Sequence, residues 1–156
     1  GINLIQANIN NIQINEAKEV IPMIDIQYTI ETEQYGNKTG NRLFIPANIF
    51  RKGFTTPDLK QRVQDIHINY GYLDTDSICL QIPEGYTIES LPKTCQVTSS
   101  FGSFSSSLMI KDKEICIIHR LLMHRGIYPK EIYKDFLEFR KQIAAQYSSK
   151  IILKKE

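Results

Sequence analysis

The sequence lacks any apolar run of the roughly 18 residues that a membrane-spanning helix needs. It also lacks a dominant charge, because 19 basic residues stand against 17 acidic ones and the formal net charge is +2. Nucleic-acid binding usually comes with a strongly basic surface, so we expect no nucleic-acid partner and no membrane span. No repeat or low-complexity segment is visible, and 156 residues suit one domain, with or without an added N-terminal segment.

Cysteine is scarce. Cys79, Cys95 and Cys116 make an odd number, and the chain has no C-x-x-C pair. This usage argues against a disulfide-stapled scaffold and against a zinc ribbon. Cys79 and Cys116 lie inside strand-like runs, where a free cysteine usually packs as a small apolar residue. The sequence therefore predicts free thiols.

Familiar catalytic motifs are missing as well. The chain has no phosphate-binding loop, no G-x-G-x-x-G, no H-E-x-x-H and no G-x-S-x-G. Cys116 and His119 are of the right type for a nucleophile and its base, but three residues apart on a strand they point to opposite faces. His67, His119 and His124 show no ligand spacing, and His119 shares a strand face with Ile117 and Leu121, so we expect it to be partly buried. The residues alone therefore give no catalytic, cofactor-binding or metal-binding site, and a self-contained cysteine hydrolase that uses Cys116 or Cys95 is kept as a third hypothesis.

Alternation of apolar and polar residues predicts half-buried antiparallel strands. The strictly alternating runs are residues 24–30, 66–72 and 78–82. Tyr28, Tyr70 and Tyr72 fall on their apolar rows, so we expect these rings in the core. The sequence Asp-Thr-Asp at 74–76 separates two of the runs and is expected to close a hairpin.

Further strands follow from less regular runs. Residues 4–14 read as a strand whose alternation changes phase at Asn10-Asn11. Residues 115–123 are almost continuously apolar, which predicts a central strand covered on both faces, at least at its start. Shorter strands are expected at 43–45, 96–100, 103–110 and 151–153.

After Tyr128 the apolar residues recur at helical spacing. Pro129 suits the first turn of a helix, where its missing N–H is no loss. The predicted helix covers about residues 129–147 and packs on the sheet through Ile132, Phe136, Leu137 and Ile143. The predicted fold is mainly β, an antiparallel β-sandwich with one C-terminal helix.

Four residues are candidates for a surface or interaction site. Ser103 and Ser105 belong to a serine-rich stretch that suits hydrogen bonding to a glycan or peptide, although the same serines also suit the polar row of an exposed strand. Tyr35 precedes the long connection at 47–62, and Phe54 lies inside it. Loops at one end of a sandwich often bind ligands, so these two rings join the list.

A resemblance adds to this interpretation. Residues 83–92 read PEGYTIESLP after a strand and resemble the "P-E-G-Y-x-[IV]-E-x-L-P" signature of a C-terminal domain of unknown function. That domain follows the transglutaminase-like core in exported proteins of Gram-negative bacteria. Further pieces occur in the family's order: RLFIP at 42–46, DIHINY at 65–70, FGSF at 101–104, YPKEIY at 128–133 and KIILKK at 150–155. The likeness covers roughly residues 40–156, and residues 47–62 depart from the family pattern.

The resemblance implies a non-catalytic accessory domain without a cofactor, because the family's catalytic triad would sit in the preceding core. The implied partner is the parent protein's transglutaminase-like core, and the implied location is the periplasm or cell envelope. Residues 41–156 would be the accessory β-sandwich. Residues 1–40 would be a strand-rich segment, either a junction to that core or part of the same sandwich.

Two further expectations accompany the resemblance. The chain opens at Gly1 without an initiator methionine, which predicts a segment of a longer protein. A rival function is a module that binds an envelope glycan or peptide.

Overall fold

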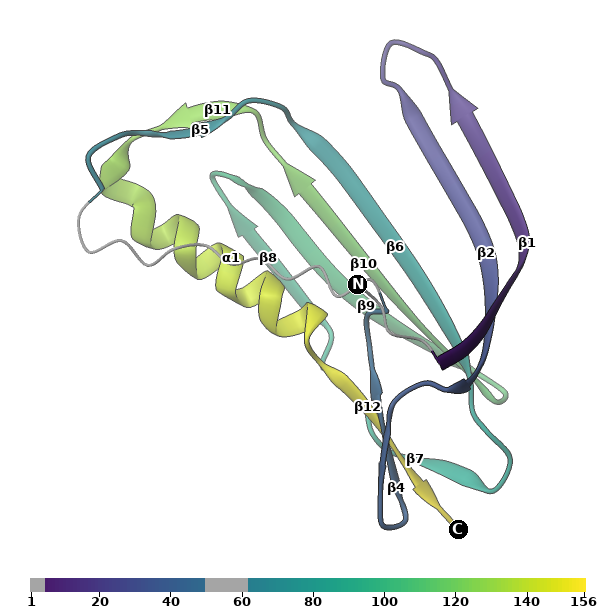
Figure 1. Cartoon of the computed structure of the whole chain (residues 1–156). Helices are drawn as coiled ribbons and strands as arrows, with labels where there is room; N and C mark the ends of the chain where they lie inside the picture. The colour runs from purple at the N-terminus through teal and green to yellow at the C-terminus, as the bar shows by residue number, and fades with distance from the viewer. Residues whose placement is uncertain (1–4, 50–61) are drawn as a thin grey trace.

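The computed structural model describes residues 5–49 and 62–156. Figure 1 shows a central sheet, a helix lying across it, a smaller sheet near the C-terminus and a hairpin that stands to one side. The elements are, in chain order, β1 (Ile5–Ala17), β2 (Met23–Gln34), β3 (Asn37–Thr39), β4 (Arg42–Pro46), β5 (Ile66–Ile68), β6 (Tyr72–Gln81), β7 (Tyr86–Ser90), β8 (Cys95–Ser99), β9 (Gly102–Lys111), β10 (Glu114–Met123), β11 (Gly126–Tyr128), a 3-10 turn (Lys130–Ile132), α1 (Tyr133–Tyr147) and β12 (Lys150–Lys155).

The main sheet is antiparallel, with the strand order β6-β10-β9-β8. β10 is a central strand because it pairs along its whole length with β6 on one side and β9 on the other. Alternation turns Ile115, Ile117 and Leu121 to one face, where all three are buried. Cys116 is buried on the opposite face, whereas Leu122 at the far end of that face is exposed. The predicted central position of this strand is confirmed, whereas its second face is buried at Cys116 and only half-buried at Glu114 and Ile118.

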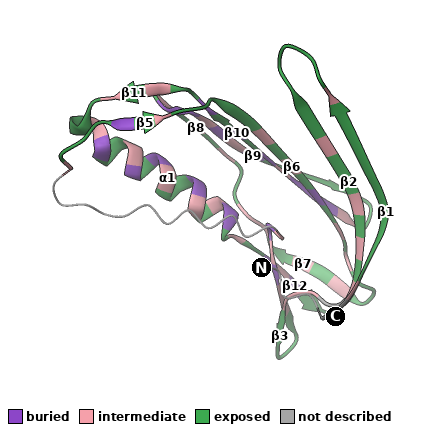
Figure 2. Ribbon diagram, turned by 45° about the horizontal axis from the view of Figure 1, so that its top comes forward, coloured by how far each residue is buried: buried purple, intermediate pink, exposed green. Residues whose placement is uncertain are grey.

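Helix α1 packs on the interior face of this sheet, and its buried residues form a stripe along the helix in Figure 2. Leu137 and Ile143 share one core cluster with Phe104 of β9. Ile132 and Phe136, the other two predicted packing residues, are partly buried against that cluster. The face of the sheet opposite α1 is called the outer face below.

The helix boundaries follow from local chemistry. Pro129 precedes the 3-10 turn, and the α-helix itself begins at Tyr133. It ends at Tyr147, where the backbone N–H of Ser148 donates to the carbonyl of Ala144 at 3.0 Å. The predicted helix is therefore confirmed, with its first turn wound more tightly than an α-helix.

The second sheet has the order β3-β4-β12-β7 and packs against the other end of β10. Ile45 of β4 and Ile151 and Leu153 of β12 share a buried cluster with Ile115 and Ile117. The layer that faces the main sheet is thus α1 at one end and the second sheet at the other. The predicted mainly β fold, with antiparallel sheets and a C-terminal helix, is confirmed.

Strands β1 and β2 form a long antiparallel hairpin with a bulge between Asn10 and Gln13. Asn11 takes up the extra residue with a φ of 54°, a conformation that asparagine tolerates better than most residues. The bulge lies where the sequence changes phase. It places the pairs Ile9–Ile30 and Ile14–Ile26 on the same face of the hairpin.

The two faces of the hairpin therefore differ in polarity. One face, called here the apolar hairpin face, carries Ile9, Ile12, Ile14, Ile24, Ile26, Tyr28 and Ile30. The other face is largely polar and includes Asn8, Asn10, Gln13, Asn15, Gln27 and Thr29. Tyr28 is half-buried, and burial together with the nearby charge of Asp76 raises the pKa of its hydroxyl. The part of β2 around Tyr28 therefore lies close to β6, the strand beside β2 in Figure 1.

Two local predictions are wrong. Residues 74–76 close no hairpin, because β6 runs through them without interruption. Ladder pairing to β10 continues along the whole strand and outweighs the turn preference of two aspartates. The break falls earlier, between β5 and β6, where Tyr70 is 82% exposed instead of buried. Tyr72 is also exposed, on an edge strand of the main sheet.

Gly102 lies where the main sheet leaves no room for a side chain. Its φ of 149° is unfavourable for any side chain, and a Cβ atom there would collide with the carbonyl oxygen of Leu122. We expect Gly102→Ala to lower the free energy of unfolding by about 3 kcal/mol or more. Gly40→Ala is the control, because Gly40 also has positive φ (+60°) but open space around it; it should cost about 1–2 kcal/mol. Urea unfolding measures both, and equal losses would contradict the steric account.

The pair Arg42–Glu89 ties β4 to β7 across β12, with N–O distances of 2.6 and 2.7 Å. The hydrogen bond from Arg42 lowers the pKa of the Glu89 carboxyl. A carboxyl whose pKa is lowered by folding stabilises the fold above its unfolded-state pKa, and this contribution is lost as the pH falls through the folded-state pKa. We expect Arg42→Gln to raise the pKa of Glu89, measured by carboxyl NMR titration. Lys38→Gln, on the same sheet, should leave the pKa of Glu89 unchanged. An unchanged pKa of Glu89 in the Arg42 variant would refute the pairing.

Candidate functional site

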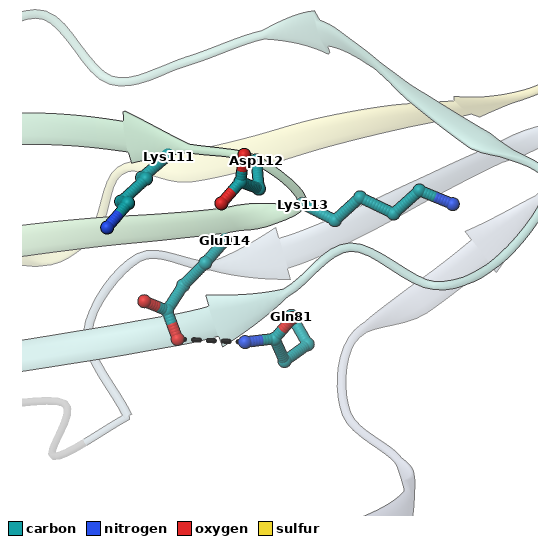
Figure 3. A pocket seen from close by; sticks show the side chains of 5 residues that line it. All are labelled: Gln81, Lys111, Asp112, Lys113 and Glu114. Atoms are coloured by element: carbon teal, nitrogen blue, oxygen red, sulfur yellow. Dashed lines mark hydrogen bonds between the residues drawn. The ribbon is translucent and has the colours of Figure 1, made fainter.

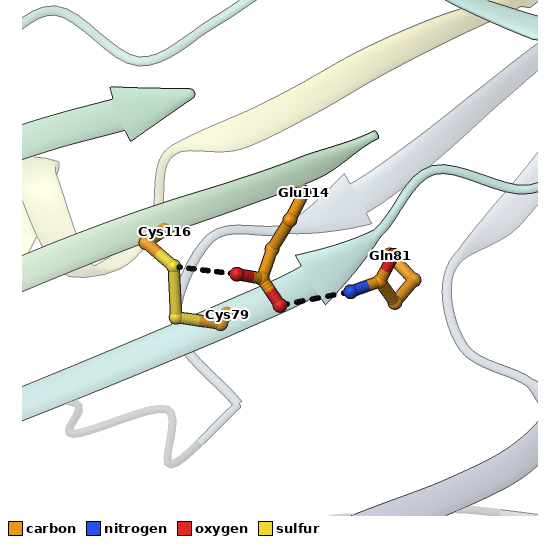
Figure 4. Close-up of a disulfide and its surroundings, with 4 residues drawn as sticks. All are labelled: Cys79, Gln81, Glu114 and Cys116. Carbon is orange, nitrogen blue, oxygen red and sulfur yellow. Dashed lines mark hydrogen bonds between the residues drawn. A yellow bond between two sulfur atoms is a disulfide. The ribbon is translucent and has the colours of Figure 1, made fainter. Parts of the chain in front are cut away.

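The strongest chemical feature lies on the outer face of the main sheet, where β6 and β10 pair. Cys79 and Cys116 are direct register partners with Cα atoms 4.1 Å apart, and they form a disulfide. Figure 4 shows this bond bridging the two strands. The prediction of free thiols at these two positions is wrong. An odd cysteine count does not forbid one pair, and strand register brought together residues that are 37 positions apart.

A carboxylate and an amide complete the cluster. Glu114 and Gln81 form the next pair along the same face, and Gln81 Nε2 donates a 2.8 Å hydrogen bond to Glu114 Oε1. The second carboxylate oxygen, Oε2, lies 3.6 Å from Cys116 Sγ. The amide therefore holds the carboxylate with one oxygen turned toward the sulfur, as Figure 4 shows. Cys79, Cys116, Glu114 and Gln81 are called the sulfur–carboxylate cluster below.

A shallow depression of about 380 Å³ lies beside this cluster. Figure 3 shows its lining: Gln81, Lys111, Asp112, Lys113 and Glu114. Asp112 and Lys113 form the turn between β9 and β10, and Asp112 has a φ of 53°. The depression is open and charged, so it suits small polar ligands or ions better than a large apolar one.

The sequence-predicted site residues lie in three different environments. Ser103 and Ser105 come together, half-buried, on the outer face of β9. Tyr35 instead packs at the second-sheet cluster, and its hydroxyl donates to the carbonyl of Pro46 at 2.9 Å. Phe54, like residues 50–61 of the predicted connection, lies outside the described residues. The four residues therefore remain a predicted interaction site, of which the structure joins only the two serines.

Cys116 and His119 do point to opposite faces of β10, as predicted. His119 is 1% exposed on the interior face, with ring centroids 5.8 Å from Phe104 and 5.1 Å from Tyr147. The histidine is therefore more deeply buried than the partly buried side chain that the sequence predicts. Cys95 has a free, half-buried thiol, and burial raises its pKa, so it is a poor nucleophile at neutral pH.

Sequence reasoning missed Glu114 and Gln81. The usable signal was the spacing of two residues in both Cys79–Gln81 and Glu114–Cys116, which puts each pair on one face of its strand. Aligning the two strands antiparallel at the cysteines would have brought all four residues together. The sequence of each strand alone does not specify that alignment.

Fold and site together define a mainly β domain whose outer sheet face carries a disulfide beside a carboxylate. Residues 41–153 match the DUF3858 family, described as a domain of unknown function with a solved structure. This match covers well over half of the chain, so the chain belongs to that family. Comparisons with curated proteins and with solved structures found no match. The matched segment runs from just before β4 into β12 and leaves the hairpin β1–β2 outside it.

None of the helices in the described ranges has the length and apolarity needed to cross a bilayer.

The disulfide makes a measurable contribution to stability. Replacing Cys79 and Cys116 together by alanine should lower the free energy of unfolding by about 2–4 kcal/mol, because the bond closes a long loop in the unfolded chain. Cys95→Ser is the control and should change stability by about 1 kcal/mol or less. Denaturant unfolding measures both variants. Thiol titration of the unfolded, unreduced chain should find the single thiol of Cys95, and three thiols there would contradict the bond.

Proposed function

We propose that this chain is a non-catalytic accessory domain of a transglutaminase-like cell-envelope protein. In this proposal, the apolar hairpin face docks onto the transglutaminase-like core of the same protein. The observation that carries the proposal is the exposure of that face. Ile9, Ile12, Ile14, Ile24 and Ile26 are each more than half exposed.

The hairpin's composition supports docking over simple solvation. Full burial of one isoleucine side chain is worth about 1.5–3 kcal/mol. A partner that covers five exposed isoleucines on one surface would therefore gain a large free energy of association. Contiguous apolar patches on monomeric proteins usually mark interaction sites. The opposite face, with its asparagines and glutamines, is suited to water.

The position of the hairpin supports the choice of occupant. It precedes the family-matched segment 41–153, and in the resembled architecture the catalytic core precedes this domain. An exposed apolar surface that precedes the family-matched segment in the chain is suited to an inter-domain interface. The partner commitment rests on that resemblance together with the exposed face.

The state of the cysteines supports a non-catalytic role in an exported protein. The sulfur atoms of Cys79 and Cys116 are bonded to each other, so neither is a thiolate nucleophile in this form. Disulfides persist in oxidising compartments such as the bacterial periplasm. Both points favour an accessory domain in the cell envelope.

A second candidate function is a module that binds an envelope glycan or peptide through the outer face. Its supporting observation is the serine row of β9, where Ser103 and Ser105 stand beside Leu122 and Arg120 of β10. Hydroxyls next to partly exposed apolar side chains suit a sugar ring or an extended peptide. Loss of glycan or peptide binding on Ser105→Ala, with core docking absent, would favour this function over the accessory role.

The experiment combines the coding sequence and a matched pair of variants. Reading the gene upstream of Ile2 should reveal a transglutaminase-like core behind an export signal. That core, produced separately, should bind this chain. Ile14→Ser with Ile26→Ser, a direct pair on the apolar hairpin face, should weaken binding by about tenfold or more.

The control is Gln13→Ser with Gln27→Ser, the adjacent pair on the polar face. It should leave the affinity unchanged, because these side chains point away from the docking surface. Calorimetry measures both variants. An upstream sequence without such a core, or equal affinity in the two variants, would overturn the proposal.

A further inference from the structure

The sulfur–carboxylate cluster has a second chemical state that the accessory role does not use. Its three ligand-type atoms, the two sulfurs and a Glu114 oxygen, all lie within 4.8 Å of one another. We infer that, once the disulfide is reduced, Cys79, Cys116 and Glu114 bind a borderline-soft divalent cation of the zinc class. Two thiolates and one carboxylate would then be the protein ligands, and water would take the fourth position.

The distances suit this ion. Zinc–sulfur bonds of about 2.3 Å and zinc–oxygen bonds of about 2.1 Å give a sulfur–oxygen edge of roughly 3.6 Å in a tetrahedron. Glu114 Oε2 already lies 3.6 Å from Cys116 Sγ. The two sulfurs must separate to about 3.8 Å after reduction. Cys79 is exposed, so its side chain has room to rotate outward and to leave a position for water.

The second shell is also in place. Ligating carboxylates in metal sites are normally held by a hydrogen bond to their other oxygen. Gln81 Nε2 makes that bond to Glu114 Oε1 at 2.8 Å and leaves Oε2 for the metal. Strand pairing fixes the backbones of all four residues on alternate rungs of one sheet, so little backbone entropy remains to be lost on binding.

The charge balance favours a cation over an empty dithiol. Two thiolates and the Glu114 carboxylate place three negative charges together, and a divalent ion cancels two of them. Lys111 and Lys113 line the adjoining depression and partly offset the third.

The redox step balances with a dithiol as reductant. The dithiol supplies two electrons and two protons, becomes a disulfide itself, and leaves Cys79 and Cys116 as thiols. The cation then displaces the two thiol protons into solvent. In the reverse exchange, the external disulfide accepts the two electrons and becomes the dithiol again, the Cys79–Cys116 bond re-forms and the metal returns to solution. The strand pair thus alternates between a covalent and a metal-bridged cross-link.

The test uses cobalt(II), a coloured substitute for zinc, and the chain with Cys95→Ser so that only two thiols remain. The protein is reduced with dithiothreitol, freed of reductant under nitrogen and titrated with the metal. We expect one cobalt per reduced chain with thiolate charge-transfer absorption, displacement by zinc, and no such absorption in the oxidised chain. Near-UV circular dichroism should keep its native form, since the site needs the strand register.

Matched variants separate this site from chance binding. Glu114→Gln should weaken binding by at least about tenfold, and Gln81→Ala by about 10- to 100-fold. Glu84→Gln, an exposed glutamate in the β6–β7 turn, should leave the affinity unchanged. The inference fails if the reduced chain shows no stoichiometric cobalt–thiolate band or loses its tertiary structure. It also fails if Glu114→Gln binds as tightly as Glu84→Gln.

Discussion

The register of β10 within its antiparallel sheet is the constraint on which the rest of the structure depends. The interior residues of β10 belong to two core clusters. Leu121 and Met123 lie in the cluster beneath α1, and Ile115 and Ile117 lie in the cluster beneath the second sheet. Shifting the pairing by one residue would turn these residues to solvent and bury the outer row, including Glu114. Because β6 and β9 both hold β10 along its full length, one strand fixes the relation between helix and second sheet.

The same register creates the chemistry of the outer face. With the apolar row turned inward, the alternate residues of β6 and β10 face outward, and Cys79 meets Cys116 directly. The cross-link therefore lies on the outer face of the sheet, next to a carboxylate that an amide already holds. A bond that stabilises the sheet and a proposed metal site thus use the same two sulfurs in different oxidation states.

The hairpin depends on a different physical requirement, the burial of its apolar face. Two strands alone cannot enclose an apolar face, and an isolated two-stranded sheet is marginally stable in water. The bulge at Asn10–Gln13 keeps the isoleucines of both halves on one side, so the unburied surface is continuous. Docking onto a neighbouring domain is the simplest way to bury such a face. The family-matched segment, 41–153, forms the sheets and helix that carry the hairpin.

Local chemistry is what the sequence by itself determined. Period-two runs located most strands, the Asn10-Asn11 phase change marked the bulge, and the helical spacing after Tyr128 located α1. Only the tertiary structure decided which strands pair. The sequence of residues 74–76 predicts a turn, but pairing with β10 makes these residues part of a strand. The sequence predicts unpaired cysteines at 79 and 116, but the strand register places them opposite each other. Strand periodicity is written within a few neighbouring residues, whereas register depends on how distant rows share one core, so the sulfur–carboxylate cluster exists only in the folded chain.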